Sequence, residues 1–183
     1  MTSYPDAATG LPQPAPVAAP TRPGALLALV GVAVLSALAA IVDGVLYFVG
    51  GRDLALDVSA QTIASITGAS ADSVKADGGA LLQAAADEVQ STLQVRGALA
   101  IFFGVVLLVW GLLALRGAAW VRVLLTLAAL ANAGVALRLA TDIEGGTAAI
   151  RAVAWLVLAT GLLAVVLSWL PAVNRYAKAR KGL

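Results

Sequence analysis

The 183-residue chain is 61% hydrophobic and only 12% charged, with a net charge of +2 and a mean hydropathy of +0.93. A soluble globular domain is about 45–50% apolar with glycine counted and about 25% charged. The composition therefore excludes an ordinary soluble protein, a disordered protein and a nucleic-acid-binding protein. The sequence contains no cysteine and no histidine. It thus lacks disulfides, thiolate metal sites, the commonest metal ligand and the commonest general base.

The chain begins with a proline-rich segment, residues 1–23, which holds six of the seven prolines and shows no apolar periodicity. We expect it to be a disordered tail. Four apolar stretches follow, each close to the roughly 20 residues that a helix needs to cross a bilayer. The sequence therefore predicts an all-α fold, a polytopic bundle of four transmembrane helices within residues 24–170. The predicted spans are 24–49, 97–115, 119–140 and 152–170.

Residues 50–96, between the first two spans, are the only sizeable polar part of this bundle domain, and their apolar residues recur at helical spacing. We expect one helix that stops at Gly68 and a second that begins near Gly79 and runs into the second span. This helical segment could cover the outer ends of the bundle, lie among the lipid headgroups or form a docking face for a partner protein. The two apolar stripes are Leu56, Ala60, Ile63 and Ile66, and Leu82, Ala85, Val89 and Leu93.

Basic residues are concentrated on one side of the predicted membrane topology. They occur in the link between the second and third spans and in the tail 171–183, whereas residues 50–96 and the link around Asp142 are mainly acidic. The positive-inside rule then places both termini in the cytoplasm, with residues 50–96 outside, and predicts a multi-pass membrane protein. In the tail, four basic residues are expected to anchor the chain at the anionic inner leaflet: Arg175, Lys178, Arg180 and Lys181.

Small residues recur along three of the spans. Membrane helices associate by close packing at such residues, because lipid is as apolar as leucine. The pattern predicts packing between helices of one chain, and a homo-oligomer through the same surfaces is the alternative. The residues are Ser36, Ala40 and Gly44 in the first span, Gly97, Gly104 and Gly111 in the second, and Gly161 in the fourth.

Asp43 is the one carboxylate well inside a predicted span, and ionisable groups at membrane depth are costly. Arg96, Arg138 and Arg151 are predicted near the same outer end. We expect Asp43 to form a buried ion pair with Arg138 or Arg151 that fixes the helix register. The alternatives are a small polar pocket for an ion, a lipid headgroup or an acidic ligand, and arginines that extend to the membrane surface. Asn132 is expected to form an interhelical hydrogen bond.

Three short motifs lie at the predicted inner ends of the spans. They read Thr21-Arg22-Pro23, Leu115-Arg116-Gly117-Ala-Ala-Trp120-Val-Arg122 and Trp169-Leu170-Pro171-Ala-Val-Asn174-Arg-Tyr176. On these motifs the chain resembles a broad group of small four-span integral membrane proteins of high-GC Gram-positive (actinobacterial) bacteria. Val121 stands where that group commonly has alanine. The resemblance implies the four-span topology of a multi-pass protein in a bacterial plasma membrane, and it implies no activity and no site residues.

The sequence offers no nucleophile–base pair, no phosphate-binding glycine loop and no carboxylate cluster at metal-ligand spacing. We therefore expect a protein without catalytic activity, without a cofactor and without a nucleic-acid partner. The leading hypothesis is an accessory, assembly or interaction subunit that contacts the lipid bilayer and a protein partner in the membrane. The alternative is a small transporter or ligand-binding protein that uses a polar site around Asp43.

Overall fold

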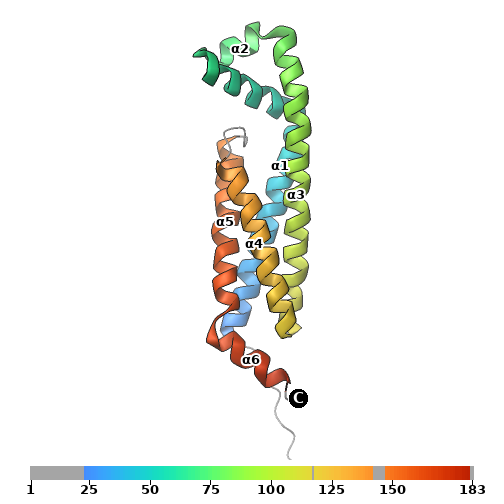
Figure 1. The fold of residues 1–183 in the computed structure, drawn as a ribbon, viewed down its shortest axis with the longest axis vertical. Helices are drawn as coiled ribbons and strands as arrows, with labels where there is room; N and C mark the ends of the chain where they lie inside the picture. Colours follow the sequence, from blue (N-terminus) through green and yellow to red (C-terminus); the bar gives the residue numbers. More distant parts are fainter. Residues whose placement is uncertain (1–22, 117, 142–146, 182–183) are drawn as a thin grey trace, which may run out of the picture.

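The computed structural model describes residues 23–116, 118–141 and 147–181, and these ranges are almost entirely helical, with no strand in them. This confirms the predicted all-α fold. Four long helices run side by side (Figure 1). They are α1 (Gly24–Thr67), α3 (Gly79–Leu113), α4 (Ala119–Thr141) and α5 (Ala148–Ser168). The short helices are α2 (Ala71–Asp77), the 3-10 helix η1 (Ala114–Arg116) and α6 (Pro171–Lys181).

The four long helices form a bundle in which each packs mainly against two neighbours, in the circular order α1, α3, α4, α5. All four are long and apolar enough to cross a membrane. Large apolar side chains such as Leu27, Phe102, Leu127 and Val166 are exposed on the outside of the bundle. Such a surface is compatible with an integral membrane protein, because lipid solvates these side chains as well as the protein interior does.

The start of α1 and the helix α6 lie at the same end of the bundle (Figure 1), called the inner end below. Pro171 opens α6 rather than only ending the fourth span, because proline is well tolerated in the first turn of a helix. Residues 171–183 were predicted to be a basic tail, and this helix was not predicted. At the opposite, outer end, α5 begins four residues earlier than the predicted 152, because Thr147 caps it through its hydroxyl.

Beyond the outer end, α1 and α3 continue past the ends of α4 and α5 (Figure 1). We call residues 52–93 the helical extension. α1 bends at Gly51, whose φ of 45° and ψ of −130° are non-helical, and ends where Gly68 takes the left-handed conformation with φ 74°. α3 begins at Gly79 and enters the bundle without a break. The predicted helix stop at Gly68 and the start near Gly79 are confirmed.

The helical extension has a small core of its own, in which Ala60, Val74 and Leu82 are buried between α1, α2 and α3. Nearer the bundle, Leu54 belongs to the same buried cluster as Ile150 at the start of α5. The base of the extension therefore covers part of the outer end of the bundle, and the rest projects away from it. Ile66, predicted on a buried stripe, is 79% exposed in the last turn of α1.

Candidate functional site

Asp43 is the buried carboxylate of the bundle, with only 2% of its surface exposed. It borders a cavity of about 10 Å³, which has room for roughly one water molecule. Within the described residues, its Oδ1 atom has no hydrogen-bond partner. The other lining residues are apolar apart from one asparagine: Ala40, Ala100, Asn132, Val135, Ala136, Leu139 and Val157.

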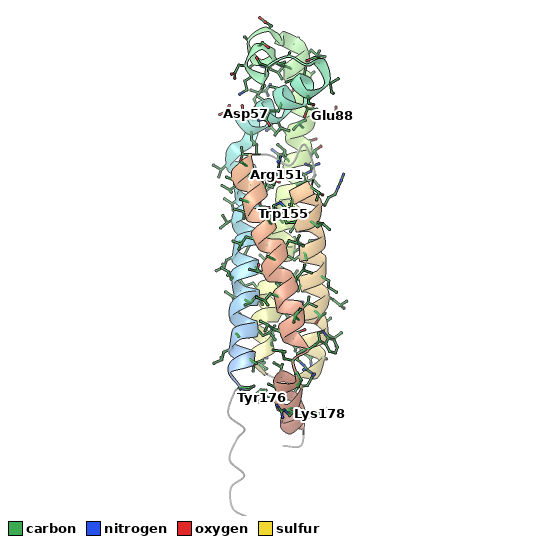
Figure 2. The ribbon with its side chains drawn as sticks, turned by 90° about the vertical axis from the view of Figure 1, so that its left-hand side faces the viewer. Asp57, Glu88, Arg151, Trp155, Tyr176 and Lys178 are labelled. Atoms are coloured by element: carbon green, nitrogen blue, oxygen red, sulfur yellow. The ribbon has the colours of Figure 1, made fainter. Side chains whose placement is uncertain are left out.

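The predicted ion pair between Asp43 and Arg138 or Arg151 is not formed, although the structure describes all three residues. Arg138 and Arg151 are both exposed, and Arg96 is half-buried on α3. Figure 2 places Arg151 at the outer end of α5. The physical reason is that a long arginine side chain near a helix end can keep its guanidinium in a polar environment, which avoids the desolvation cost of a buried pair.

Ser36 and Asn132 form the buried polar contact between helices in the middle of the bundle. The Ser36 hydroxyl donates to the carbonyl of Val157 on α5 at 3.2 Å, and the Asn132 amide on α4 donates to Ser36 Oγ at 3.5 Å. The expectation that Asn132 makes an interhelical hydrogen bond is confirmed. These bonds join α1, α4 and α5 and satisfy polar groups that would be costly to leave unpaired in an apolar interior.

The backbones of α1 and α3 approach each other closely where the two helices cross, at Gly44 and Gly97. A Cβ atom on Gly44 would lie 2.6 Å from the carbonyl oxygen of Gly97 and 2.5 Å from Ile101 Cγ1. A Cβ on Gly97 would lie 2.9 Å from the carbonyl oxygen of Gly44. Each glycine therefore leaves room for the other helix, as the small-residue packing of membrane helices requires.

Further toward the inner end, the same α1–α3 contact continues at two more glycines of α3. A Cβ on Gly104 would lie 3.0 Å from the carbonyl oxygen of Ala37, and one on Gly111 would lie 3.2 Å from Ala33 Cβ. Ala40 also contacts this surface, 3.2 Å from the Cβ position of Gly104. Ser36 instead faces α5, where Gly161 has only ordinary contacts of 3.5 Å or more.

At the inner end, two of the interfacial motifs meet. Arg122 at the start of α4 donates from Nη1 to Asn174 Oδ1 on α6, and the Asn174 amide donates to the carbonyl of Trp169 at 3.2 Å. Tyr176, two residues further along, is buried in the core cluster of this end. These contacts were not predicted from the sequence. Arg122 and Asn174 are polar residues at the ends of apolar helices, and this is the sequence signal that could have indicated a contact between them.

We predict that Asn174→Ala lowers the stability of the protein by about 1–2 kcal/mol, because it removes the acceptor of a partly buried, charged donor. Arg122 Nε already has no partner among the described residues, so the loss of Asn174 leaves the guanidinium still less satisfied. The measurement is thermal unfolding in detergent, followed by tryptophan fluorescence. The control is Asn174→Asp, which keeps an acceptor for Arg122 and should lose less stability. Equal losses for both variants would contradict the role of this contact.

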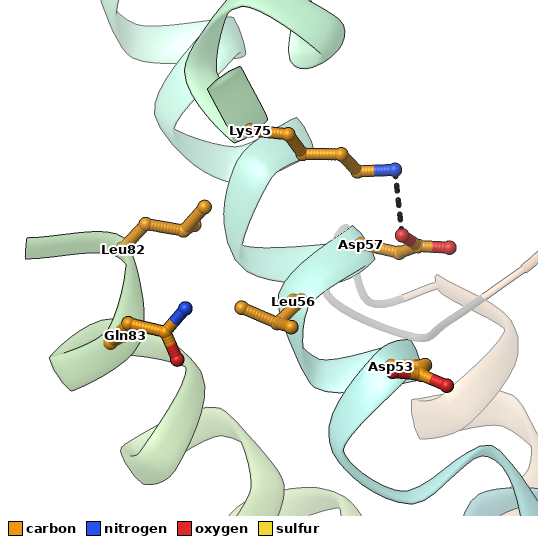
Figure 3. A pocket seen from close by; sticks show the side chains of 6 residues that line it. All are labelled: Asp53, Leu56, Asp57, Lys75, Leu82 and Gln83. Carbon is orange, nitrogen blue, oxygen red and sulfur yellow. Dashed lines mark ion pairs between the residues drawn. The ribbon is translucent and has the colours of Figure 1, made fainter. Parts of the chain in front are cut away.

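The helical extension carries two exposed ion pairs, between Arg52 and Asp87 at 2.9 Å and between Lys75 and Asp57 at 2.7 Å. Hydrogen bonding and charge attraction by Asp57 raise the pKa of Lys75. Figure 3 shows this second pair beside a shallow pocket of about 300 Å³ between α1, α2 and α3. Four other carboxylates of the extension are exposed and form no ion pair with the described residues: Asp53, Asp72, Asp77 and Glu88.

The basic residues of the tail lie on α6. Arg175 and Lys178 are exposed, whereas Val173, Tyr176 and Ala177 on the same helix are buried against the bundle. Figure 2 shows Lys178 at the inner end, next to Tyr176. The side chains of Arg180 and Lys181, predicted with them as a membrane anchor, lie outside the described part of the structure.

Comparisons with known proteins identify no family: no family model, no curated protein and no solved structure matches the chain. Across the described ranges, no group of three or more acidic, histidine or cysteine side chains is placed to hold a metal ion. The candidate sites are therefore those that the geometry itself supplies, namely Asp43 and its cavity, the helical extension and the surface grooves of the bundle.

Proposed function

We propose that the protein is an accessory or assembly subunit of the plasma membrane without catalytic activity, and that its helical extension binds a partner protein. The observation that carries this proposal is the extension itself. It is a folded helical unit with its own core, which projects beyond the four spans and is continuous with two of them. A protein whose only task lay within the bilayer would not need this structure at the membrane surface.

The charge of the extension indicates the chemistry of the partner. It holds six carboxylates and two basic side chains, and both basic side chains are already paired with acidic ones. The remaining four carboxylates are exposed, so the surface presents a net negative field. A basic protein surface would complement it, and such complementarity favours fast and specific association. In the proposed topology, with both termini in the cytoplasm, this contact lies outside the cell.

The test is affinity purification of the tagged full-length protein in mild detergent, followed by mass spectrometry. We expect a protein to co-purify with the wild type and to be lost from the triple variant Asp53→Asn, Asp72→Asn and Asp77→Asn. Exposed charges act mainly on association and its salt dependence, so binding should also weaken as the salt concentration rises.

The matched control is the triple variant Asp53→Glu, Asp72→Glu and Asp77→Glu, which keeps every negative charge. It should retain the partner, whereas loss of the partner from both triple variants would show that charge is not what is recognised. Recovery of the wild-type protein alone in several detergents would count against the accessory role.

A second candidate function is ligand binding at Asp43, and the unpartnered Oδ1 atom is the observation that favours it. Buried polar atoms without a partner are rare and often mark a functional group. The cavity volume of about 10 Å³ limits the ligand to a proton or a single small ion or water molecule. The discriminating measurement is proton uptake by vesicles that contain the wild type or Asp43→Asn. Equal uptake would remove this candidate.

A further inference from the structure

The helical extension has a second pocket, of about 290 Å³, formed by residues of α1 and α3. Ser59, which is only 2% exposed, lies at its floor, whereas Glu88 and Thr92 are exposed and lie at its rim. Figure 2 shows Glu88 on the side of the extension opposite to Asp57. The pocket is therefore distinct from the one beside the Lys75–Asp57 ion pair.

The Ser59 hydroxyl is buried and has no hydrogen-bond partner within the described residues. A serine or threonine inside a helix can donate its hydroxyl hydrogen to a backbone carbonyl of the preceding turn. Two threonines of the same helix do so, since Thr62 donates to the carbonyl of Val58 and Thr67 to that of Ile63, both at 2.9 Å. A buried polar group is costly unless it is hydrogen-bonded. The floor of the pocket thus holds an unused hydroxyl that a polar ligand would satisfy.

The other polar groups of the pocket are hydrogen-bond acceptors. Glu88 forms no ion pair with the described residues, so its carboxylate is not neutralised. The hydroxyl hydrogens of Thr62 and Thr92 are donated to the carbonyls of Val58 and Glu88, which leaves the lone pairs of the two hydroxyl oxygens. The pocket therefore favours a ligand that carries a positive charge and donates several hydrogen bonds.

A primary ammonium group meets both requirements, because it carries one positive charge and three N–H donors. Half-buried Ile63, Ala85 and Val89 supply an apolar wall for an alkyl chain attached to it. An anion would be repelled by Glu88, and an uncharged apolar ligand would leave the Ser59 hydroxyl unpaired. A metal ion is disfavoured, since no group of three acidic, histidine or cysteine side chains in the described part of the chain is placed to hold one.

We propose that this pocket binds a primary alkylammonium group, with the nitrogen at Glu88 and Ser59 and the alkyl chain against Ile63, Ala85 and Val89. Glu88 supplies the opposite charge, and the Ser59 oxygen accepts one N–H at the floor. The group belongs either to a free alkylamine or to a lysine side chain of the partner protein, and only the second source rests on the proposed function. Binding of a free amine tests the pocket without a partner, so the two proposals can fail separately.

The test is a titration of the full-length protein, purified in a nonionic detergent, with n-butylammonium, followed by saturation-transfer NMR of the ligand. Empty detergent micelles give the background. We expect n-butylammonium to bind about fivefold more tightly than butan-1-ol, which has the same alkyl chain without the charge. It should exceed n-butyltrimethylammonium by a similar factor, because the quaternary ion keeps the charge and has no N–H donor.

Two variants test the assigned residues. Glu88→Gln removes the charge and Ser59→Ala removes the acceptor at the floor, so each should weaken n-butylammonium binding about fivefold. Without amine, Ser59→Ala should unfold at the wild-type temperature or slightly above it, because it deletes a buried hydroxyl that has no partner. The matched controls are Asp72→Asn and Ser91→Ala, two exposed residues of the extension that do not line the pocket. Neither control should change amine binding.

Several results would overturn the proposal. They are equal affinity for n-butylammonium and either comparison ligand, and unchanged amine binding in Glu88→Gln or in Ser59→Ala. A lower unfolding temperature of Ser59→Ala without amine would also overturn it, because the hydroxyl would then have a partner inside the protein.

Affinity purification of Glu88→Gln distinguishes the two sources of the ammonium group, since Glu88 is not changed in the triple variants described above. Loss of a partner that the wild type retains assigns the group to a lysine of that partner. Recovery of the same partner by both forms, or of none by either form, assigns it to a free amine.

Discussion

Gly44→Ala is expected to destabilise the protein by about 3 kcal/mol or more, at the upper end of the usual cost of overpacking. The added Cβ would lie 2.6 Å from the carbonyl oxygen of Gly97, and this backbone atom cannot rotate away as a side chain could. The two helices would have to separate, and the contact that continues along Gly104 and Gly111 would loosen with them. Thermal unfolding in detergent, together with the yield of folded protein, measures the effect.

The control is Gly31→Ala in the same helix, where no described atom lies within 4 Å of the new methyl group. There alanine should be neutral or slightly stabilising, because it favours a helix by about 1 kcal/mol over glycine. A comparable loss at both positions would mean that the loss does not come from the α1–α3 contact. An unchanged stability of Gly44→Ala would contradict the role of the close contact between Gly44 and Gly97.

Asp43→Asn is expected to accumulate like the wild type and to gain about 1–3 kcal/mol in stability, because the amide removes a carboxylate that is costly to bury. The side chain keeps its shape, so the surrounding apolar residues need not move. No ion pair is broken by this change, since none joins Asp43 to the arginines that the structure describes. The measurement is again the unfolding temperature in detergent.

The opposite result has a clear meaning. If Asp43→Asn accumulates poorly or unfolds at a lower temperature, the carboxylate has a partner of opposite charge in the membrane, as the sequence analysis expected. Asp53→Asn serves as the control, because this carboxylate is exposed on the helical extension and its removal should change stability little. If Asp43→Asn gains stability and Asp53→Asn does not, the destabilising effect of the Asp43 carboxylate is due to its burial.

Much of the fold could be predicted because a bilayer imposes one dominant pattern. Spanning helices need about 20 apolar residues, and this requirement alone identifies the four spans. The positions of glycines were equally informative, because Gly68 and Gly79 mark helix ends that depend on positive φ angles. By contrast, α6 was missed, because its polar composition resembles a tail and its helix depends on contacts of Val173 and Tyr176 with the bundle.

The site was harder to predict than the fold. The regular spacing of Gly97, Gly104 and Gly111 indicated a packing surface, but spacing alone does not say which helix it meets. For Asp43, depth in the membrane correctly suggested burial, yet the choice of an arginine partner needed the direction of both side chains.

The unbroken course of α3 has a mechanical consequence. This helix has 35 residues and is therefore about 52 Å long, and it runs from the helical extension to the inner end with no break. α1 also runs between the helical extension and the inner end, but it bends at Gly51. The helical extension is thus joined to the bundle by one continuous helix and by one bent helix. Any motion of the helical extension relative to the bundle would therefore have to change the bend at Gly51 and tilt or bend α3 as well.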